Sequence, residues 1–280
     1  MKNKNVQNIL IYTDFTELGD NSIEWGIFLA KKFKRKIHLI HVINENSYVL
    51  FNKENVLTEV KNELEKLSLE IIEKYNIECD YFFDEGCTCT IINSTAERID
   101  AFLIVVGNHG KNDPQFLSGS ALVKIIRKSR IPYFVIQKKT KSPEIMGDIV
   151  IPIDARKEMK EKTGWVTYFA KNCGNPISII ADGLDDPKID NNIKFCSNFF
   201  DKYSLKYQIQ KLTKSSWNID KSVLKIIDNE NTFCMSIITT KNENLFNKIF
   251  GLPETDIISN NKSIPVLCIN PKKDLYIPCL

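Results

Sequence analysis

A repeat at half length constrains this 280-residue chain more than any other feature. Residues 8–14 and 148–154 are both short apolar runs that end in aspartate, at an offset of 140. Later segments match at an offset of 133, as Ile-Pro-Tyr-Phe-Val-Ile at 131–136 and Ile-Pro-Val-Leu-Cys-Ile at 264–269 illustrate. Two constant offsets indicate two copies of one fold, with seven residues lost from the middle of the second copy. Two unrelated α/β domains are the weaker alternative.

Within the first copy, continuous apolar runs alternate with stretches whose apolar residues recur at helical spacing. We expect strands at 8–13, 36–43, 77–83, 101–106 and 132–137, and helices at 19–34, 53–75, 88–98 and 119–129. This alternation predicts an α/β fold in which each copy forms a five-stranded parallel sheet sandwiched by helices. The polar, proline-containing stretch 138–144 predicts a boundary, which gives expected domains at 1–140 and 147–280.

Composition excludes several classes of protein. The 38 basic and 35 acidic residues leave a net charge of +3, which is too balanced to indicate nucleic-acid binding. The polar N-terminus and the lack of a long apolar run predict a cytoplasmic protein without a membrane span. Among eight cysteines the close pair is Cys87 and Cys89, with no histidine near it in sequence. Inert thiols are therefore favoured over a metal site.

The chemistry is concentrated in residues 105–121, where a strand ends in Gly107, a turn carries Gly110, and Gly119-Ser120 opens a helix. Glycines allow close approach of a ligand to the backbone, and a helix start offers free N–H groups to an anion. Ligands of open α/β sheets bind at the carboxyl ends of the strands. A phosphate cradle and an ordinary loop with a serine cap both fit this pattern. His109 either faces a phosphate or packs in the turn.

This segment resembles the universal stress protein motif, which reads G-x-x-G, nine residues, then G-S/T. Here Gly107 and Gly110 are followed by eight residues before Gly119-Ser120, so the loop is one residue shorter. The resemblance is clear over residues 8–137, and residues 148–271 resemble the family as a copy that has lost part of the motif. It implies two tandem Rossmann-like domains, of which the first carries the nucleotide-binding loop.

The resemblance also implies a ligand and its contacts. In ATP-binding members of the family, the aspartate after the first strand and the valine of the second lie at the adenosine, and the glycine loop holds the phosphates. By motif position, the implied nucleotide-binding residues are Thr13, Asp14, Val42, Val106, Gly107, His109, Gly110, Gly119, Ser120 and Ala121. The implied cofactor is ATP or another adenine nucleotide, with or without Mg²⁺, in the N-terminal domain only.

Asp14 has a second interpretation, because an aspartate after a strand often caps the following helix. We expect that helix to start at Asp20, several residues later, so a ligand role for Asp14 has at least equal weight.

The second copy has lost the loop. At the motif positions stand Thr240, Glu243, Leu252 and Pro253, while Val42 is replaced by Asp182 and the first-strand aspartate survives as Asp154. A carboxylate repels phosphate and a proline lacks an amide donor. We therefore expect residues 147–280 not to bind ATP. Because universal stress proteins commonly dimerise through the last strand of each sheet, this copy is expected to pack on the first as an intramolecular pseudo-dimer.

Three functions remain after this comparison. The favoured one is a stress-response module that binds an adenine nucleotide and acts on a protein partner that the sequence does not identify, with a further homodimer left open. A slow ATPase lacks candidate catalytic residues beyond Asp14 and His109, so we expect no enzyme. A nucleotide-free scaffold is the third. A dehydrogenase is disfavoured, because no G-x-G-x-x-G follows the first strand.

Overall fold

The computed structural model describes residues 8–110, 119–144, 147–239 and 253–271. The first half contains β1 (Asn8–Tyr12), α1 (Glu17–Phe33), β2 (Ile37–Ile43), α2 (Ser47–Leu50), α3 (Val56–Tyr75), β3 (Cys79–Glu85), α4 (Thr88–Arg98), β4 (Ala101–Asn108), α5 (Gly119–Lys128) and β5 (Tyr133–Gln137). The second contains β6 (Asp148–Ile153), the 3-10 helix η1 (Lys157–Lys162), α6 (Thr163–Cys173), β7 (Ile177–Ala181), α7 (Pro187–Lys202), β8 (Tyr207–Lys211), α8 (Ile219–Ile226), β9 (Thr232–Ile238), α10 (Pro253–Ile258) and β10 (Val266–Ile269).

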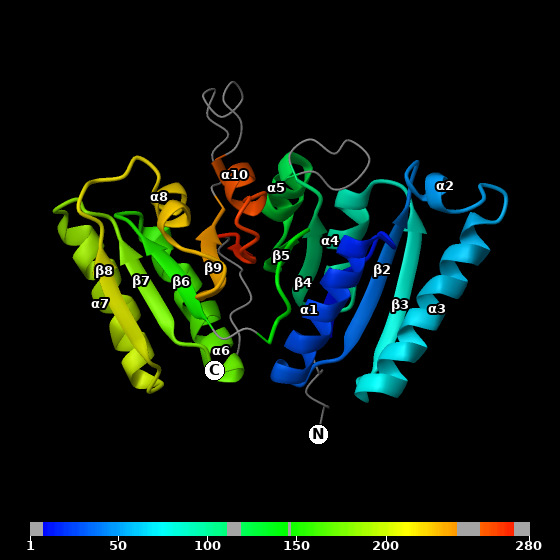
Figure 1. Ribbon diagram of the computed structural model, residues 1–280, viewed down its shortest axis with the longest axis horizontal. Coiled ribbons are helices and arrows are strands. Elements are labelled where there is room, and N and C mark those ends of the chain that lie inside the picture. Colours follow the sequence, from blue (N-terminus) through cyan, green and yellow to red (C-terminus); the bar gives the residue numbers. More distant parts are fainter. Residues whose placement is uncertain (1–7, 111–118, 145–146, 240–252, 272–280) are drawn as a thin grey trace.

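All these strands form one ten-stranded sheet in the order β3-β2-β1-β4-β5-β10-β9-β6-β7-β8 (Figure 1). Neighbouring strands within each half pair in parallel, whereas β5 and β10 pair antiparallel, with Val135 opposite Val266. The carboxyl end of β5 therefore lies beside the amino end of β10. This arrangement places the turn between α10 and β10 next to the carboxyl edge of the first sheet.

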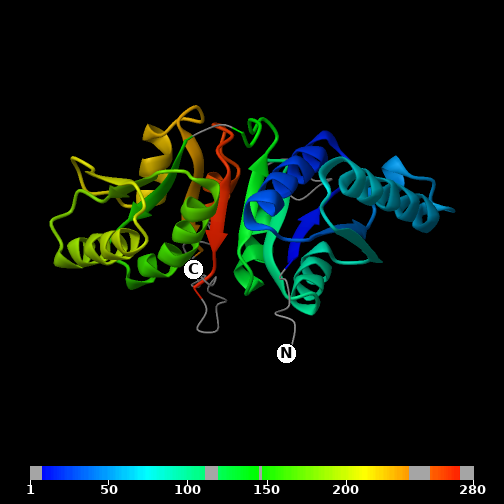
Figure 2. The ribbon, with the colours of Figure 1, turned by 90° about the horizontal axis from the view of Figure 1, so that it is seen from below.

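The helices cover both faces of the sheet. One hydrophobic core lies under α1, α3, α6 and α7, and the other lies under α4, α5, α8 and α10. Both cores extend across the two halves, whose central strands β5 and β10 lie side by side in Figure 2. Trp25 of α1, for example, contacts Phe134 of the first half and Phe233 of the second, with ring centroids 5.4 and 5.5 Å apart. Among the described residues, no helix is both long and apolar enough to cross a membrane.

The predicted α/β fold and its repeat are confirmed. Every expected strand and helix of the first half is present within a few residues, and β6–β10 repeat the order of β1–β5. One expectation was wrong: α1 begins at Glu17 rather than near Asp20, because the Thr16 side chain accepts a hydrogen bond from the N–H of Gly19 and caps the helix there. The short helix α2 was not foreseen, and residues 182–186 hold no counterpart of it in the second half.

We call the contact of β5 and α5 with β10 and α10 the seam. Polar side chains form hydrogen bonds and an ion pair across it. The Arg127 guanidinium of α5 donates to both carboxylate oxygens of Glu254 in α10, at 3.0 and 3.2 Å. Their side chains are only 11% and 5% exposed, so this ion pair lies inside the protein. The Asn270 amide, just after β10, donates to the carbonyls of Ile126, Arg127 and Ser129.

We expect Glu254→Ala to lower the free energy of unfolding by about 2–4 kcal/mol, because it removes one partner of a buried ion pair. The urea midpoint of the whole chain measures this change.

Asp190→Ala is the matched control, because the Asp190–Lys211 pair on the second half is exposed and exposed pairs stabilise little. Equal destabilisation by the two variants would contradict a special role for the seam pair.

Candidate functional site

The candidate site lies where β2, β1 and β4 end next to one another, at the carboxyl edge of the first sheet. Asp14 follows β1, Val42 lies near the end of β2, and His109 follows β4. The parallel pairing of these neighbours brings together residues that are far apart in sequence. The edge is the expected ligand position of an open α/β sheet.

Asp14 and His109 form a hydrogen-bonded pair at the centre of this edge. His109 Nε2 lies 2.6 Å from Asp14 Oδ2, and each side chain is 10% exposed. The hydroxyl of Thr16 donates to Asp14 Oδ1 at 2.6 Å, and the Thr16 amide does so at 3.2 Å. Burial raises the pKa of the Asp14 carboxyl, but the hydrogen bonds from His109 and Thr16 outweigh it and hold the pKa below its usual value. Asp14 is therefore ionised at neutral pH.

The expectation that Asp14 lies several residues from the helix start is corrected by this geometry. Because α1 starts at Glu17, Asp14 holds its capping residue Thr16 and so helps to shape the helix terminus. A carboxylate offers about four acceptor positions, and the contacts named above use three of them. Asp14 can therefore serve the fold and still accept a hydrogen bond from a ligand.

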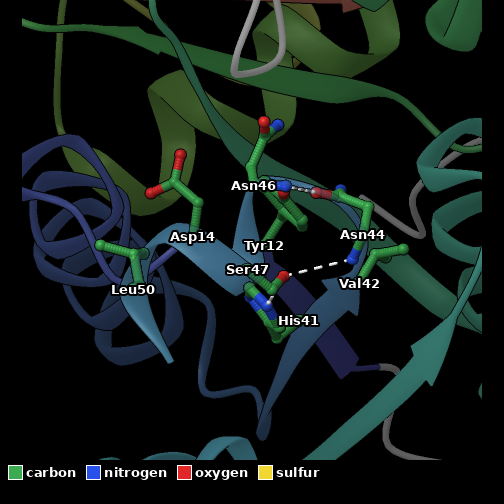
Figure 3. A pocket seen from close by; sticks show the side chains of 8 residues that line it. All are labelled: Tyr12, Asp14, His41, Val42, Asn44, Asn46, Ser47 and Leu50. Carbon is green, nitrogen blue, oxygen red and sulfur yellow. Dashed lines mark hydrogen bonds between the residues drawn. The ribbon is translucent and has the colours of Figure 1, made fainter. Parts of the chain in front are cut away.

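A small hollow lies on one side of the Asp14–His109 pair. It is lined by Tyr12, Asp14, His41, Val42, Asn44, Asn46, Ser47 and Leu50, which Figure 3 shows as sticks. Its volume is about 10 Å³, roughly the room that one water molecule needs. Helix α2, which contributes Ser47 and Leu50, forms part of the lining.

His41 and Ser47 attach α2 to the site, and the sequence reasoning missed both. His41 Nδ1 lies 2.8 Å from the Thr13 carbonyl and Nε2 lies 2.9 Å from the Ser47 hydroxyl. Burial lowers the pKa of His41 below its usual value, although the bond to Thr13 opposes this shift. The ring is therefore neutral at pH 7, so Nδ1–H donates to the carbonyl and Nε2 accepts from Ser47. A histidine beside the predicted contact Val42 was the available sequence signal.

Each of the three glycines of the motif is explained by a different structural requirement. A Cβ at Gly107 would lie 2.5 Å from Cγ of Leu18, so this glycine allows α1 to pack on β4. A Cβ at Gly119 would lie 2.0 Å from Oγ of Ser259, so this one allows α5 to pack on the second half. Gly110 has a φ of +99°, a conformation that favours glycine, and no atom of the described residues lies within 4 Å of a Cβ position there.

The other predicted contacts divide between the core and the helix start. Thr13 and Val106 are fully buried, whereas Ser120 is exposed and Ala121 half-buried. The expectation of free N–H groups at the start of α5 is wrong for Gly119, whose N–H donates to the carbonyl of Gly110 at 3.0 Å. The shortened part of the loop, residues 111–118, lies outside the described residues.

A larger cavity of about 300 Å³ lies on the His109 side of the Asp14–His109 pair. We call it the seam cavity, because both halves line it: Asn108, His109, Gly110, Gln137, Lys138 and Lys139 from the first, and Ser259, Asn260, Asn261 and Ser263 from the second. Asp14 lines the small hollow and His109 lines the seam cavity. The hydrogen-bonded pair thus lies between two spaces at the same sheet edge.

The equivalent edge of the second half is filled by its own charges. Asp154, the counterpart of Asp14, accepts from the backbone N–H and the Nε of Arg156 at 2.9 and 2.7 Å. Arg156 also reaches Asp220, 3.5 Å away. Lys162 is fully buried below them, which lowers its pKa to about 8, and it donates to backbone carbonyls. The positions that replace the glycines, Thr240, Glu243 and Leu252, lie outside the described residues.

The described part of the chain contains no cluster of histidine, cysteine, aspartate and glutamate side chains that could hold a metal ion.

Comparisons with known proteins agree with this architecture. Residues 5–137 match the universal stress protein family. Universal stress protein MJ0531 of Methanocaldococcus jannaschii is 26% identical over 143 residues, which cover 48% of this chain and 84% of that protein.

Two solved structures extend the likeness of fold to both halves. A universal stress protein from Archaeoglobus fulgidus DSM 4304 has a TM-score of 0.73 at 17% identity, over 96% of this chain and 98% of its own. Protein PA1789 from Pseudomonas aeruginosa PAO1 has a TM-score of 0.62 at 14% identity, over 95% and 93%. Residues 5–137 therefore form a universal stress protein domain by sequence, and the fold of both halves resembles that of these solved structures.

Proposed function

We propose that this universal stress protein is a regulatory module that binds one ATP or other adenine nucleotide per chain, in a domain spanning residues 1–140. The observation that carries the proposal is the assembly of Asp14, Val42, His109 and Gly110 at one sheet edge, between two hollows. The filling of the equivalent edge by Arg156 supports a single site.

The small hollow is the proposed adenosine side of the site. Its volume of about 10 Å³ is too small for an adenine ring as it stands. Binding therefore requires α2 to move outward, which would break the bonds of Ser47 to His41 and of Tyr48 to Glu85, while Leu50 is already exposed. A nucleotide-free scaffold is the second candidate, and the closed state of this hollow is the observation that favours it.

We further propose that the second domain, residues 147–280, binds no nucleotide and takes the place of a dimer partner through the pairing of β5 with β10. A protein partner, a cytoplasmic location and weak ATP hydrolysis stay predictions from the sequence. Among the described residues, His109 is the one titratable side chain hydrogen-bonded to Asp14, and no second carboxylate contacts it. The described residues therefore provide no pair of carboxylates at this position for hydrolysis.

The charge of Asp14 predicts a pH dependence of folding. A carboxyl group whose pKa is lower in the folded than in the unfolded state stabilises the fold above its ordinary pKa, and this stabilisation is lost as the pH falls through the folded pKa. We expect Asp14→Asn to lower the free energy of unfolding at pH 7 by about 1 kcal/mol, with the difference vanishing well below pH ~4. Urea unfolding between pH 7 and strongly acidic pH measures it.

Asp185→Asn is the control, because Asp185 is exposed. A difference between wild type and Asp14→Asn that stays constant down to the lowest pH would contradict the charged pair.

The function itself is tested by calorimetric titration with ATP and adenosine. We expect one ATP per chain, and a loss of affinity of roughly tenfold or more in Asp14→Ala, because a hydrogen bond to a charged group contributes about 1.5–3 kcal/mol.

Asp154→Ala makes the same change at the equivalent position of the second half and should leave the affinity unchanged. Two nucleotides per chain would contradict the single site. No binding and no rise in melting temperature with ATP would instead select the scaffold.

A further inference from the structure

We infer that the seam cavity is a phosphate-binding site built jointly by the two halves, and that a nucleotide seated against Asp14 extends its phosphates into it. The first part of this inference stands on the cavity alone, and the second rests on the proposed function.

The composition of the walls favours an anion. Of the ten residues that line the cavity, two are lysines, none is acidic, and the rest are histidine, glycine, serine or side-chain amides. Among the described residues no carboxylate forms an ion pair with Lys138 or Lys139. The nearby carboxylate of Asp14 is already paired with His109. Phosphate oxygens accept hydrogen bonds from ammonium, hydroxyl and amide groups. Because the side-chain amides of Asn108, Gln137 and Asn260 already donate within the protein, the main donors for an anion are the ammonium groups of the two lysines.

The lysine wall is a defined turn. The N–H of Thr140 donates to the carbonyl of Gln137, which closes a four-residue turn with Lys138 and Lys139 at its tip. The Thr140 hydroxyl accepts from the Gln137 amide and donates to the carbonyl of Ser263, which ties this turn to the second half. The two ammonium groups are thus carried on an ordered support next to the cavity.

The opposite wall of the cavity, residues 259–263, is also held in place by hydrogen bonds. The Asn260 side chain donates to the carbonyls of Ile257 and Ile264 and accepts from the N–H of Ile264. Ser263 adopts a φ of +57°, a left-handed conformation that these bonds maintain. Asn261 lies at the exposed tip of the turn, and its side-chain amide forms no hydrogen bond with another described residue. The second half therefore presents a built turn to the cavity.

The third wall connects the cavity to the proposed nucleotide site. Asn108 donates to the Ile258 carbonyl and to the Ser259 hydroxyl, at 2.6 and 2.9 Å, and accepts from the N–H of Gly110. The second half thereby positions the residues that flank His109. The volume of about 300 Å³ lies at the lower end of the range for ligand pockets, which suits a chain of phosphates rather than a base and sugar.

The test compares three probes, ATP, adenosine and inorganic tripolyphosphate, on the full chain by calorimetric titration at about 150 mM salt, where exposed charges are screened beyond about 8 Å. In the double variant Lys138→Gln/Lys139→Gln, we expect ATP and tripolyphosphate to bind roughly tenfold more weakly, because charge-assisted hydrogen bonds are lost. Adenosine should bind as in wild type. Asn261→Ala should weaken the two phosphate probes roughly threefold, through loss of one neutral hydrogen bond.

Lys61→Gln/Lys66→Gln is the matched control, since it removes the same charge from the exposed side of α3. Equal weakening by the two double variants would overturn the inference. Unchanged ATP binding in Lys138→Gln/Lys139→Gln would overturn it while leaving the proposed function intact.

The probes also separate the two statements. Tripolyphosphate binding that depends on Lys138 and Lys139, without binding of ATP or adenosine, would support the seam cavity as a site for a free polyphosphate and refute the proposed function. Unchanged binding of phosphate probes in Asn261→Ala would refute the contribution of the second half.

Discussion

The antiparallel pairing of β5 with β10 is the interaction on which the rest of this structure depends. An open five-stranded sheet exposes the unpaired N–H and C=O groups of its edge strands, and apolar edges of this kind associate readily. The pairing removes one such edge from each half and continues both hydrophobic cores across the seam. Separation of the halves would expose Trp25, Phe134 and Phe233 to water, so the two copies are held as one body.

Much of this arrangement follows from sequence pattern. The offsets of 140 and 133 predict that every strand of the first half has a counterpart in the second, and β6–β10 bear this out. The candidate edge was also accessible, because Asp14, Val42 and His109 each follow or end a predicted strand and parallel strands end at a common edge. Local periodicity and a general rule of α/β sheets were sufficient for that much.

The remaining features depend on contacts that sequence pattern does not express. The start of α1 at Glu17 follows from the Thr16 cap and its bond to Asp14. In the sequence, Gly119 is explained by the needs of a phosphate-binding loop. In the structure, the lack of a side chain at Gly119 leaves room for Ser259 of the other half. The seam cavity is formed by residues about 120 positions apart, such as Lys138 and Asn261, and no local signal relates them.

The backbone of the seam has two-fold symmetry, but its side chains do not follow this symmetry. This difference helps to explain why the chain has two unlike copies. At the offset of 133, the counterparts of Arg127 and Glu254 are Asn260 and Ala121, so the buried ion pair occurs once and cannot be repeated by symmetry. Two first halves would set Arg127 against an alanine, and a buried charge without its partner is costly. The seam therefore favours unlike halves.

This asymmetry has a consequence for the sites. Because β5 and β10 run in opposite directions, the segment of the second half that reaches the carboxyl edge of the first is its α10–β10 turn, which lies away from its own carboxyl edge. The second half could therefore fill its carboxyl edge with Arg156 and Lys162 without altering the walls of the seam cavity. The charges that fill the carboxyl edge of the second half and the turn that supports the candidate site of the first lie on different surfaces of the same domain, so neither feature opposes the other.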